Sequence, residues 1–147
     1  MKGRSHPQTL AAVRAIYDEL AARPIERACE RRTDCCHFRL TGRTPFLTKG
    51  EAAVAAAALR ATGRTKLPLR EDGACPLLEP GTGRCLIYDG RPFGCRTHFC
   101  AAAGGPYARS EVVDLIHRLE GIDTELGGGE ARPLSAALQS ALRGQCR

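Results

Sequence analysis

The distribution of the cysteines constrains this chain more than any other feature of its sequence. Four of the eight cysteines lie close together in the middle of the chain, separated by nine, nine and four residues. They are Cys75, Cys85, Cys95 and Cys100. A second cluster lies upstream and consists of Cys29, Cys35 and Cys36. We expect the two clusters to fold together around a metal.

The expected cellular compartment supports this interpretation. The N-terminal segment lacks the apolar stretch of a signal peptide, so we expect a cytoplasmic protein. In a reducing compartment, clustered cysteines are more often metal ligands or redox groups than structural disulfides. Disulfides and buried free thiols are the alternatives. No two cysteines are separated by two residues, which argues against thioredoxin chemistry and the usual zinc ribbon.

Eight side chains are the predicted metal ligands. They are Cys29, Cys35, Cys36, Cys75, Cys85, Cys95, Cys100 and His98. Adjacent cysteines do not readily bond to each other, so one of the vicinal pair can bind a metal while the other packs or serves a second site. Thiolates around a metal leave negative charge that needs compensation. Arg91 and Arg96 lie among the central cysteines, and we expect them to donate hydrogen bonds to sulfur. Cys146 is expected to be a free terminal thiol.

The predicted fold is mainly α (small α+β), with about four helices, a short β-hairpin and cysteine-rich loops that form the metal centre. We expect residues 1–147 to be a single domain. Apolar residues at helical spacing predict a helix over 8–22. Thr48 and Glu51 fit a capping box, which predicts an alanine-rich helix ending at Gly63. That helix is apolar nearly all round, so we expect it to be mostly buried.

Two further helices are predicted in the last third of the chain. Ser110 is the expected N-cap of a helix that carries apolar residues along one face. A glycine-rich stretch over 127–132 is expected to be a flexible break. The C-terminal helix begins near Pro133, a residue suited to a first-turn position.

A hairpin and a turn are predicted between the central cysteines. Residues 77–78 and 86–88 are apolar and flank a Pro-Gly-Thr-Gly turn, which is typical of two short paired strands. Such a hairpin would bring Cys75 towards Cys85. Residues 89–92 predict a second turn, immediately before Cys95.

Charge and hydropathy narrow the range of partners. The net charge is +6, but the basic residues are spread along the chain without a basic run. Aromatic side chains that stack on bases are not interleaved with them, so the sequence disfavours nucleic acid as a partner. The longest apolar run is 52–59, far short of the roughly 20 residues that span a membrane. A metal ion is therefore the primary expected partner, with a protein as a second one.

Three motifs together resemble a known family. In chain order they are CERRTDCCHF, CPLL and CLIYDGRPFGCRTHFC, which resemble the YkgJ-type cysteine-cluster family, described as a putative zinc- or iron-chelating domain with a CxxCxxCC signature. The most specific part is CLIYDGRPFGCR. Arg32 stands where the second cysteine of the signature falls, so the resemblance implies a remodelled site or another ligand such as His98. A related region occurs in flagellin lysine methylases, which implies an accessory role in protein modification as one possibility.

Three functions compete at this point. The first is an iron or iron-sulfur protein that serves in redox chemistry or supports an enzymatic reaction. The second is a structural zinc module that presents a surface to a protein or RNA partner. The third is a metal-handling protein with exchangeable ligands. Iron is placed slightly ahead by the resemblance rather than by the cysteine spacing, and whether the protein is an enzyme is left open.

Overall fold

The structure is a computed structural model in which helices predominate. It describes residues 5–23, 46–67, 75–79, 85–97, 109–127 and 131–144. The elements in chain order are α1 (His6–Ala22), β1 (Phe46–Leu47), α3 (Lys49–Ala61), the 3-10 helix η2 (Tyr88–Gly90), α4 (Phe93–Thr97), α5 (Arg109–Glu125), β2 (Arg132–Pro133) and α6 (Leu134–Gly144). Four long helices and one short two-stranded sheet confirm the predicted fold class.

The first helix begins two residues earlier than its apolar pattern indicates. Ser5 is its N-cap, and Ser5 and Gln8 form a reciprocal capping box. The Ser5 backbone N–H donates to the Gln8 side chain at 2.9 Å. Pro7 therefore lies inside the first turn of α1 rather than ahead of the helix, where its missing N–H costs nothing.

Helix α3 lies at the centre of the fold, as its alanine-rich sequence predicts. Its N-cap is Thr48, and the capping box with Glu51 is present. The helix ends at Ala61, followed by Gly63 with a φ of 89°. Its buried residues are Gly50, Glu51, Ala52, Ala53, Val54, Ala55, Ala56 and Leu59. Small side chains allow the other helices to approach α3 closely on several sides.

Two apolar clusters form the core, and α3 contributes to both. One cluster joins α3 to α6 and to residues around Cys75, Leu77 and Ile87. The other joins α1 and α5 to Val54 of α3 and to Phe93 of α4. The residues around Cys75 and the residue two positions before Cys95 are therefore both packed into the helical core.

The sheet is formed by residues that the sequence analysis did not assign to strands. β1 pairs antiparallel with β2, with Phe46 opposite Pro133 and Leu47 opposite Arg132. β1 leads into α3 and β2 leads directly into α6, so the pairing holds the starts of these helices together. Of the predicted hairpin, the described residues show one isolated bridge, between Leu78 and Cys85.

The expected start of α5 was also slightly wrong. The helix already includes Arg109, so Ser110 lies in its first turn and is not the N-cap. The C-terminal helix begins at Leu134, directly after Pro133, as expected. The glycine-rich break over 127–132 stays a prediction, because residues 128–130 lie outside the described part of the chain.

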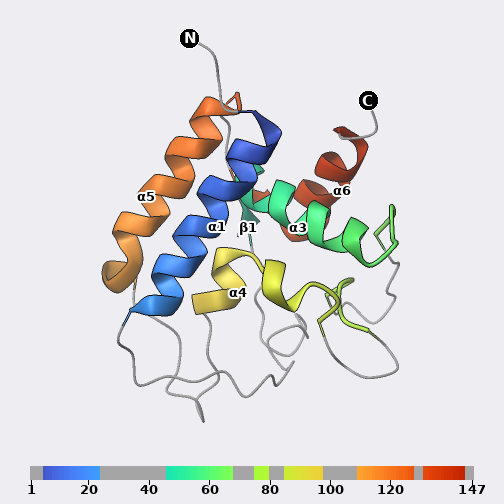
Figure 1. The fold of residues 1–147 in the computed structure, drawn as a ribbon, viewed down its shortest axis with the longest axis horizontal. Helices are drawn as coiled ribbons and strands as arrows, with labels where there is room; N and C mark the ends of the chain where they lie inside the picture. The colour runs from blue at the N-terminus through green and yellow to red at the C-terminus, as the bar shows by residue number, and fades with distance from the viewer. Residues whose placement is uncertain are drawn as a thin grey trace.

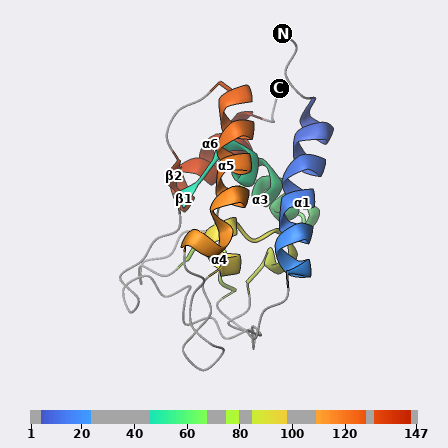
Figure 2. The ribbon, with the colours of Figure 1, turned by 90° about the vertical axis from the view of Figure 1, so that its left-hand side faces the viewer.

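One end of the helical body carries the start or end of several elements. α1 ends and α5 begins at this end, and α4 lies beside them (Figure 1). A view turned by 90° shows the same arrangement, with α4 below the paired helices α1 and α5 (Figure 2). The chain therefore leaves α1 towards the first cysteine cluster, and enters α5 after the second one, from the same end.

Candidate metal centre

Three of the predicted ligands lie within the described residues. Cys75 is buried in the cluster that joins α3 and α6, while Cys85 is half-buried against the same cluster. The Leu86 backbone N–H donates to the Leu77 carbonyl at 2.8 Å. Together with the Leu78–Cys85 bridge, this contact holds the segments of Cys75 and Cys85 side by side, as the predicted hairpin required.

The segment between Cys85 and Cys95 is shaped by the predicted turn. It forms η2, in which the Gly90 N–H donates to the Ile87 carbonyl at 2.7 Å. Gly90 is buried against α3, and a Cβ at this position would lie 2.7 Å from the Cβ of Ala58. Only glycine permits this close approach without movement of the backbone. α4 begins at Phe93, three residues after Gly90, and Cys95 lies half-buried within it.

Arg91 and Arg96, the two arginines expected near the sulfurs, hold this segment in place. The Nε of Arg91 donates to the Tyr88 carbonyl at 2.9 Å, and its guanidinium lies 3.9 Å from the centroid of the Tyr88 ring. Arg96 donates to the carbonyls of Arg91, at 2.7 Å, and of Asp89. Both arginines therefore hold the backbone that leads to Cys95. Their predicted hydrogen bonds to sulfur stay a prediction.

Glu51 connects the central helix to α4, a role that its capping box did not reveal. One carboxylate oxygen accepts from the Thr48 N–H at 2.8 Å and from the Thr48 hydroxyl at 2.9 Å. The other oxygen accepts from the Phe93 N–H at 2.8 Å. Burial raises the pKa of Glu51 above its ordinary value, although these hydrogen bonds act in the opposite direction. The position of α4, and with it Cys95, thus depends on a buried carboxyl group of α3.

Tyr17 of α1 lies next to this connection. Its ring belongs to the core, as its place on an apolar stripe predicts, and the Arg96 guanidinium lies 4.0 Å from the ring centroid. The Tyr17 hydroxyl is buried and has no hydrogen-bond partner among the described residues. Burial, followed by the nearby Glu51 charge, raises the pKa of Tyr17 well above its ordinary value.

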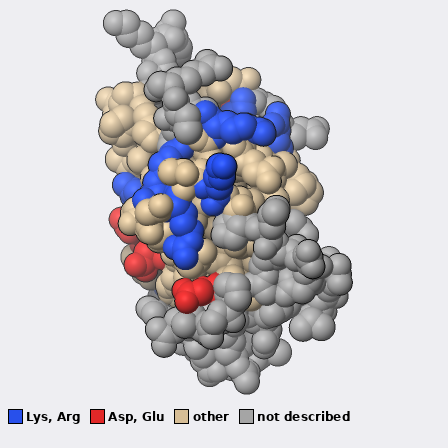
Figure 3. Space-filling view, turned by 90° about the vertical axis from the view of Figure 1, so that its right-hand side faces the viewer, with Lys and Arg blue, Asp and Glu red and all other residues tan. Residues whose placement is uncertain are grey.

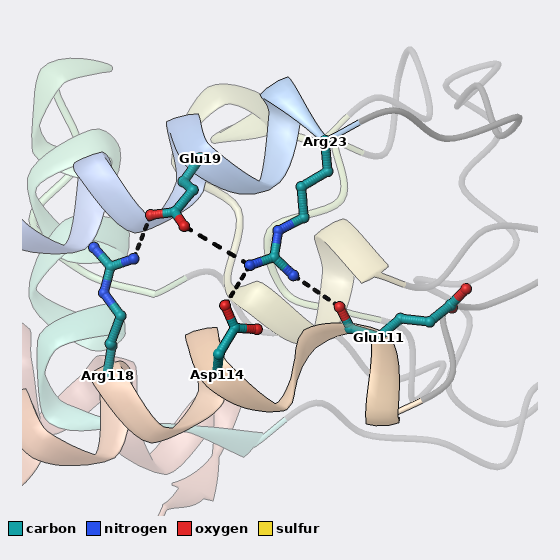
Figure 4. Close-up of polar contacts among 5 residues, drawn as sticks. All are labelled: Glu19, Arg23, Glu111, Asp114 and Arg118. Carbon is teal, nitrogen blue, oxygen red and sulfur yellow. Dashed lines mark hydrogen bonds and ion pairs between the residues drawn. The ribbon is translucent and has the colours of Figure 1, made fainter.

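Ion pairs connect the end of α1 to α5. Arg23 donates to the Glu111 carbonyl at 2.7 Å and to the Asp114 carboxylate, and it also pairs with Glu19 (Figure 4). Arg118 donates to the second oxygen of Glu19. The hydrogen bond from Arg23 lowers the pKa of Asp114 below its ordinary value. These contacts tie the last turn of α1 to the first turns of α5.

The remaining predicted ligands lie outside the described residues. They are Cys29, Cys35, Cys36, His98 and Cys100. Within the described ranges, no group of three or more His, Cys, Asp or Glu side chains is arranged to hold a metal ion. Cys75, Cys85 and Cys95 therefore do not complete a site by themselves. Their thiols are nevertheless the donor type that zinc and iron take from proteins.

The fold and this arrangement define a small helical protein with thiol donors at one side of its core. A family model described as CxxCxxCC, a putative zinc- or iron-chelating domain, matches residues 28–114. The match spans more than half of the chain and includes every predicted ligand. The chain belongs to this family. Neither a curated protein nor a solved structure gives a match.

Among the described residues, none forms a helix that is both long enough and apolar enough to cross a bilayer.

Proposed function

We propose that the protein binds iron, as a single ion or as an iron-sulfur cluster, through cysteine thiolates drawn from both clusters. The observation that carries the proposal is the position of the thiols within the family match. All seven cysteines of the two clusters lie inside residues 28–114, and the three described ones are held by separate contacts to the helical core. Zinc is the alternative metal, since the family description names both.

The proposed ligand set joins the two clusters. Cys75, Cys85 and Cys95 would supply three thiolates, and at least one of the upstream cysteines would complete the set. The three described thiols are not arranged as a three-donor group, so the proposal needs donors from the upstream cluster to bring the set together. His98 is the further candidate where Arg32 replaces a signature cysteine.

The surroundings of Cys95 suit a thiolate centre. Four thiolates around Zn(II) or an oxidised four-iron cluster leave a net charge of about −2, which a buried site must compensate. Arg96 is half-buried, follows Cys95 in α4 and is fixed by two backbone carbonyls. Its charge is therefore held on the same short helix as Cys95 by backbone carbonyls. When bound, an iron centre would supply redox chemistry or would assist a protein-modification reaction.

Metal content is the first measurement. The protein would be purified without oxygen and without added metal, and the metal per chain and the absorption spectrum would be recorded. Several irons with broad absorption near about 400 nm would establish a cluster. One iron without that band would indicate a mononuclear site. Stoichiometric colourless zinc would refute the iron proposal.

Single substitutions test the ligand set. We expect Cys95→Ser to lower the metal content or to make bound metal easily removed by a chelator. Cys146→Ser is the matched control, because Cys146 lies outside the family match and is expected to be a free thiol. Equal metal content in both variants would remove Cys95 from the set.

The second candidate function is a structural zinc module that binds an acidic partner. Lys and Arg side chains gather on one face of the molecule, and acidic side chains lie near its edge (Figure 3). This is the side of the molecule on which α6 and the end of α3 lie (Figure 1). Exposed basic residues include Arg64 and Lys66, which follow α3, and Arg143 in the last turn of α6. Stoichiometric zinc together with unfolding upon chelation would favour this function over iron chemistry.

A further inference from the structure

A single buried carboxyl group holds the starts of two helices. Glu51 is only 3% exposed and lies in the first turn of α3. One of its oxygens accepts from the Thr48 N–H at 2.8 Å and from the Thr48 hydroxyl at 2.9 Å. The other oxygen accepts from the N–H of Phe93, the first residue of α4, at 2.8 Å. The same side chain therefore caps its own helix and the helix that carries Cys95.

Helix α4 depends on contacts with the rest of the fold. It has only five residues, whereas isolated helices are marginal in water below about 12 to 15 residues. The first N–H groups of a helix need acceptors from outside the helix, which an N-cap side chain usually supplies. The residue before α4 is Pro92, whose side chain has no acceptor atom. Glu51 supplies that acceptor from another helix.

The chemistry of the side chain matters at residue 51. A carboxylate accepts hydrogen bonds at both oxygens, whereas an amide accepts at its oxygen and donates from its nitrogen. The donors that converge on Glu51 come from two helices, so an amide can serve only one of the two. Burial of a carboxyl group also carries a cost that an apolar side chain would avoid. Its bonds to both helices explain why this group stands in an alanine-rich, buried helix.

We propose that Glu51 is a positioning residue for metal binding, which holds Cys95 in its ligand position before the metal arrives. The inference rests on the proposed function, in which Cys95 is a ligand. The Cys95 backbone N–H donates to the Pro92 carbonyl at 3.1 Å, so Cys95 belongs to the turn that Glu51 caps. A ligand that is already ordered loses less conformational freedom on binding, which strengthens the binding. Glu51 acts on the metal through the backbone of α4 and does not touch it.

The first test measures how firmly Cys95 is held in the metal-free, full-length protein. Alkylation by iodoacetamide under native conditions would be followed at each cysteine by mass spectrometry, without oxygen. We expect Cys95 of the wild type to react more slowly than in denaturing urea. Glu51→Gln should accelerate the reaction by about 10-fold or more, the effect of losing one hydrogen bond to a charged group. Cys75 is the internal reference, because it packs in the other apolar cluster, and its rate should change much less.

The second test measures metal binding by the same variant. We expect Glu51→Gln to lower Zn²⁺ affinity by about 10-fold or more, since the loss of outer partners of metal ligands typically has an effect of this size. Competition with a chromophoric chelator, without oxygen, would give the affinity. We also expect the sulfur-to-metal charge-transfer band of the Co²⁺ form to lose intensity, because this band reports the thiolates bound to the metal.

Thr48→Val is the matched control. It removes the hydroxyl that donates to Glu51 and caps α3, but leaves the Glu51 carboxylate bound to Phe93. Valine is similar to threonine in shape, so the buried space around residue 48 stays filled. We expect a lower urea midpoint than in the wild type, because an N-cap is lost. The ratio of the Cys95 and Cys75 alkylation rates and the Zn²⁺ affinity should remain those of the wild type.

Several results would overturn the inference, and they separate it from the proposed function. Equal alkylation of Cys95 in native and urea-denatured wild type would show that Cys95 is not held, even if Glu51→Gln fails to fold. Equal acceleration of Cys95 and Cys75 in Glu51→Gln, or the same loss of Zn²⁺ affinity in Thr48→Val, would indicate general destabilisation. Wild-type Zn²⁺ affinity in Glu51→Gln, with metal lost in Cys95→Ser, would reject the positioning role but leave Cys95 as a ligand. Full metal binding by Cys95→Ser would reject Cys95 as a ligand and the inference with it.

Discussion

Replacement of Gly90 by alanine tests how closely the cysteine-bearing segment approaches the central helix. A Cβ at residue 90 would lie 2.7 Å from the Cβ of Ala58, closer than such atoms approach in real proteins. Both atoms are rigidly attached to the backbone, so the backbone of η2 or of α3 must move. Gly90 has no positive φ, which leaves overpacking as the only cost. We expect Gly90→Ala to lower the free energy of unfolding by about 1–3 kcal/mol.

A double-mutant cycle with Ala58→Gly isolates this clash. Ala58→Gly alone should cost about 1 kcal/mol, because glycine is a poor helix former. In that background the new Cβ would meet only the carbonyl oxygen of Val54 at 3.7 Å and its Cγ1 at 3.9 Å, both ordinary contacts. We therefore expect most of the cost of Gly90→Ala to disappear. The coupling free energy should be about 1–2 kcal/mol, above the 0.3–0.5 kcal/mol or so within which independent sites add.

Urea denaturation followed by far-UV circular dichroism would give the four free energies of unfolding. The metal-free protein should be used, because a bound metal adds its own binding energy to the stability. If Gly90→Ala costs the same in both backgrounds, the contact with Ala58 is not the cause. If Gly90→Ala has no cost at all, the close approach of η2 to α3 is itself refuted.

Three further predictions concern the helical core and its charges. Gly50→Ala should destabilise the protein by about 1–2 kcal/mol in urea denaturation, because the new Cβ would lie 2.9 Å from a valine methyl of α1. Gly121→Ala, which places its Cβ in open space, should stabilise the protein by up to about 1 kcal/mol. Two effects of the same sign would contradict the packing around these glycines. Because burial raises the pKa of Glu51, the native state keeps the carboxyl proton to higher pH than the unfolded chain, and stability should fall as pH rises from about 4.5 through the raised pKa. Glu51→Gln should lack this pH-dependent part of the stability. Parallel pH profiles of the urea midpoint for the two metal-free proteins would count against the prediction. Arg23→Gln should lower the urea midpoint more at low salt than in about 1 M NaCl, because salt screens the ion pair between Arg23 and the exposed Asp114. An equal difference at both salt concentrations would argue against an electrostatic role of Arg23.

Local signals predicted the helices well. The capping box of Thr48 and Glu51 and the apolar residues of α1 depend on spacings of three and four residues, which the backbone geometry of a helix fixes. The burial of α3 on most sides also followed from its sequence alone. The capping box at Ser5 and Gln8 carried the same signal and could have been found, which would have corrected the start of α1.

Pairings over long distances in the sequence were not predicted. The β1–β2 sheet has two residues in each strand, too few for an alternating pattern, and its register follows from the packing of α3 against α6. The second partner of Glu51 is Phe93, which is 42 residues away. The same holds for the contact of Arg96 with the Tyr17 ring. No local pattern encodes such contacts.

The sequence by itself determined the class of this protein. The order of the cysteines along the chain and the motif CLIYDGRPFGCR were enough to predict membership of a metal-chelating family. Thiols bind metals through their own chemistry, which does not depend on the fold that carries them. Only the tertiary structure decided that Cys75 is buried in the core, that the helix of Cys95 is attached through Glu51 to α3, and that Arg96 lies over the Tyr17 ring. These relations depend on distances in space between separate helices, and such distances are set by packing rather than by spacing along the chain.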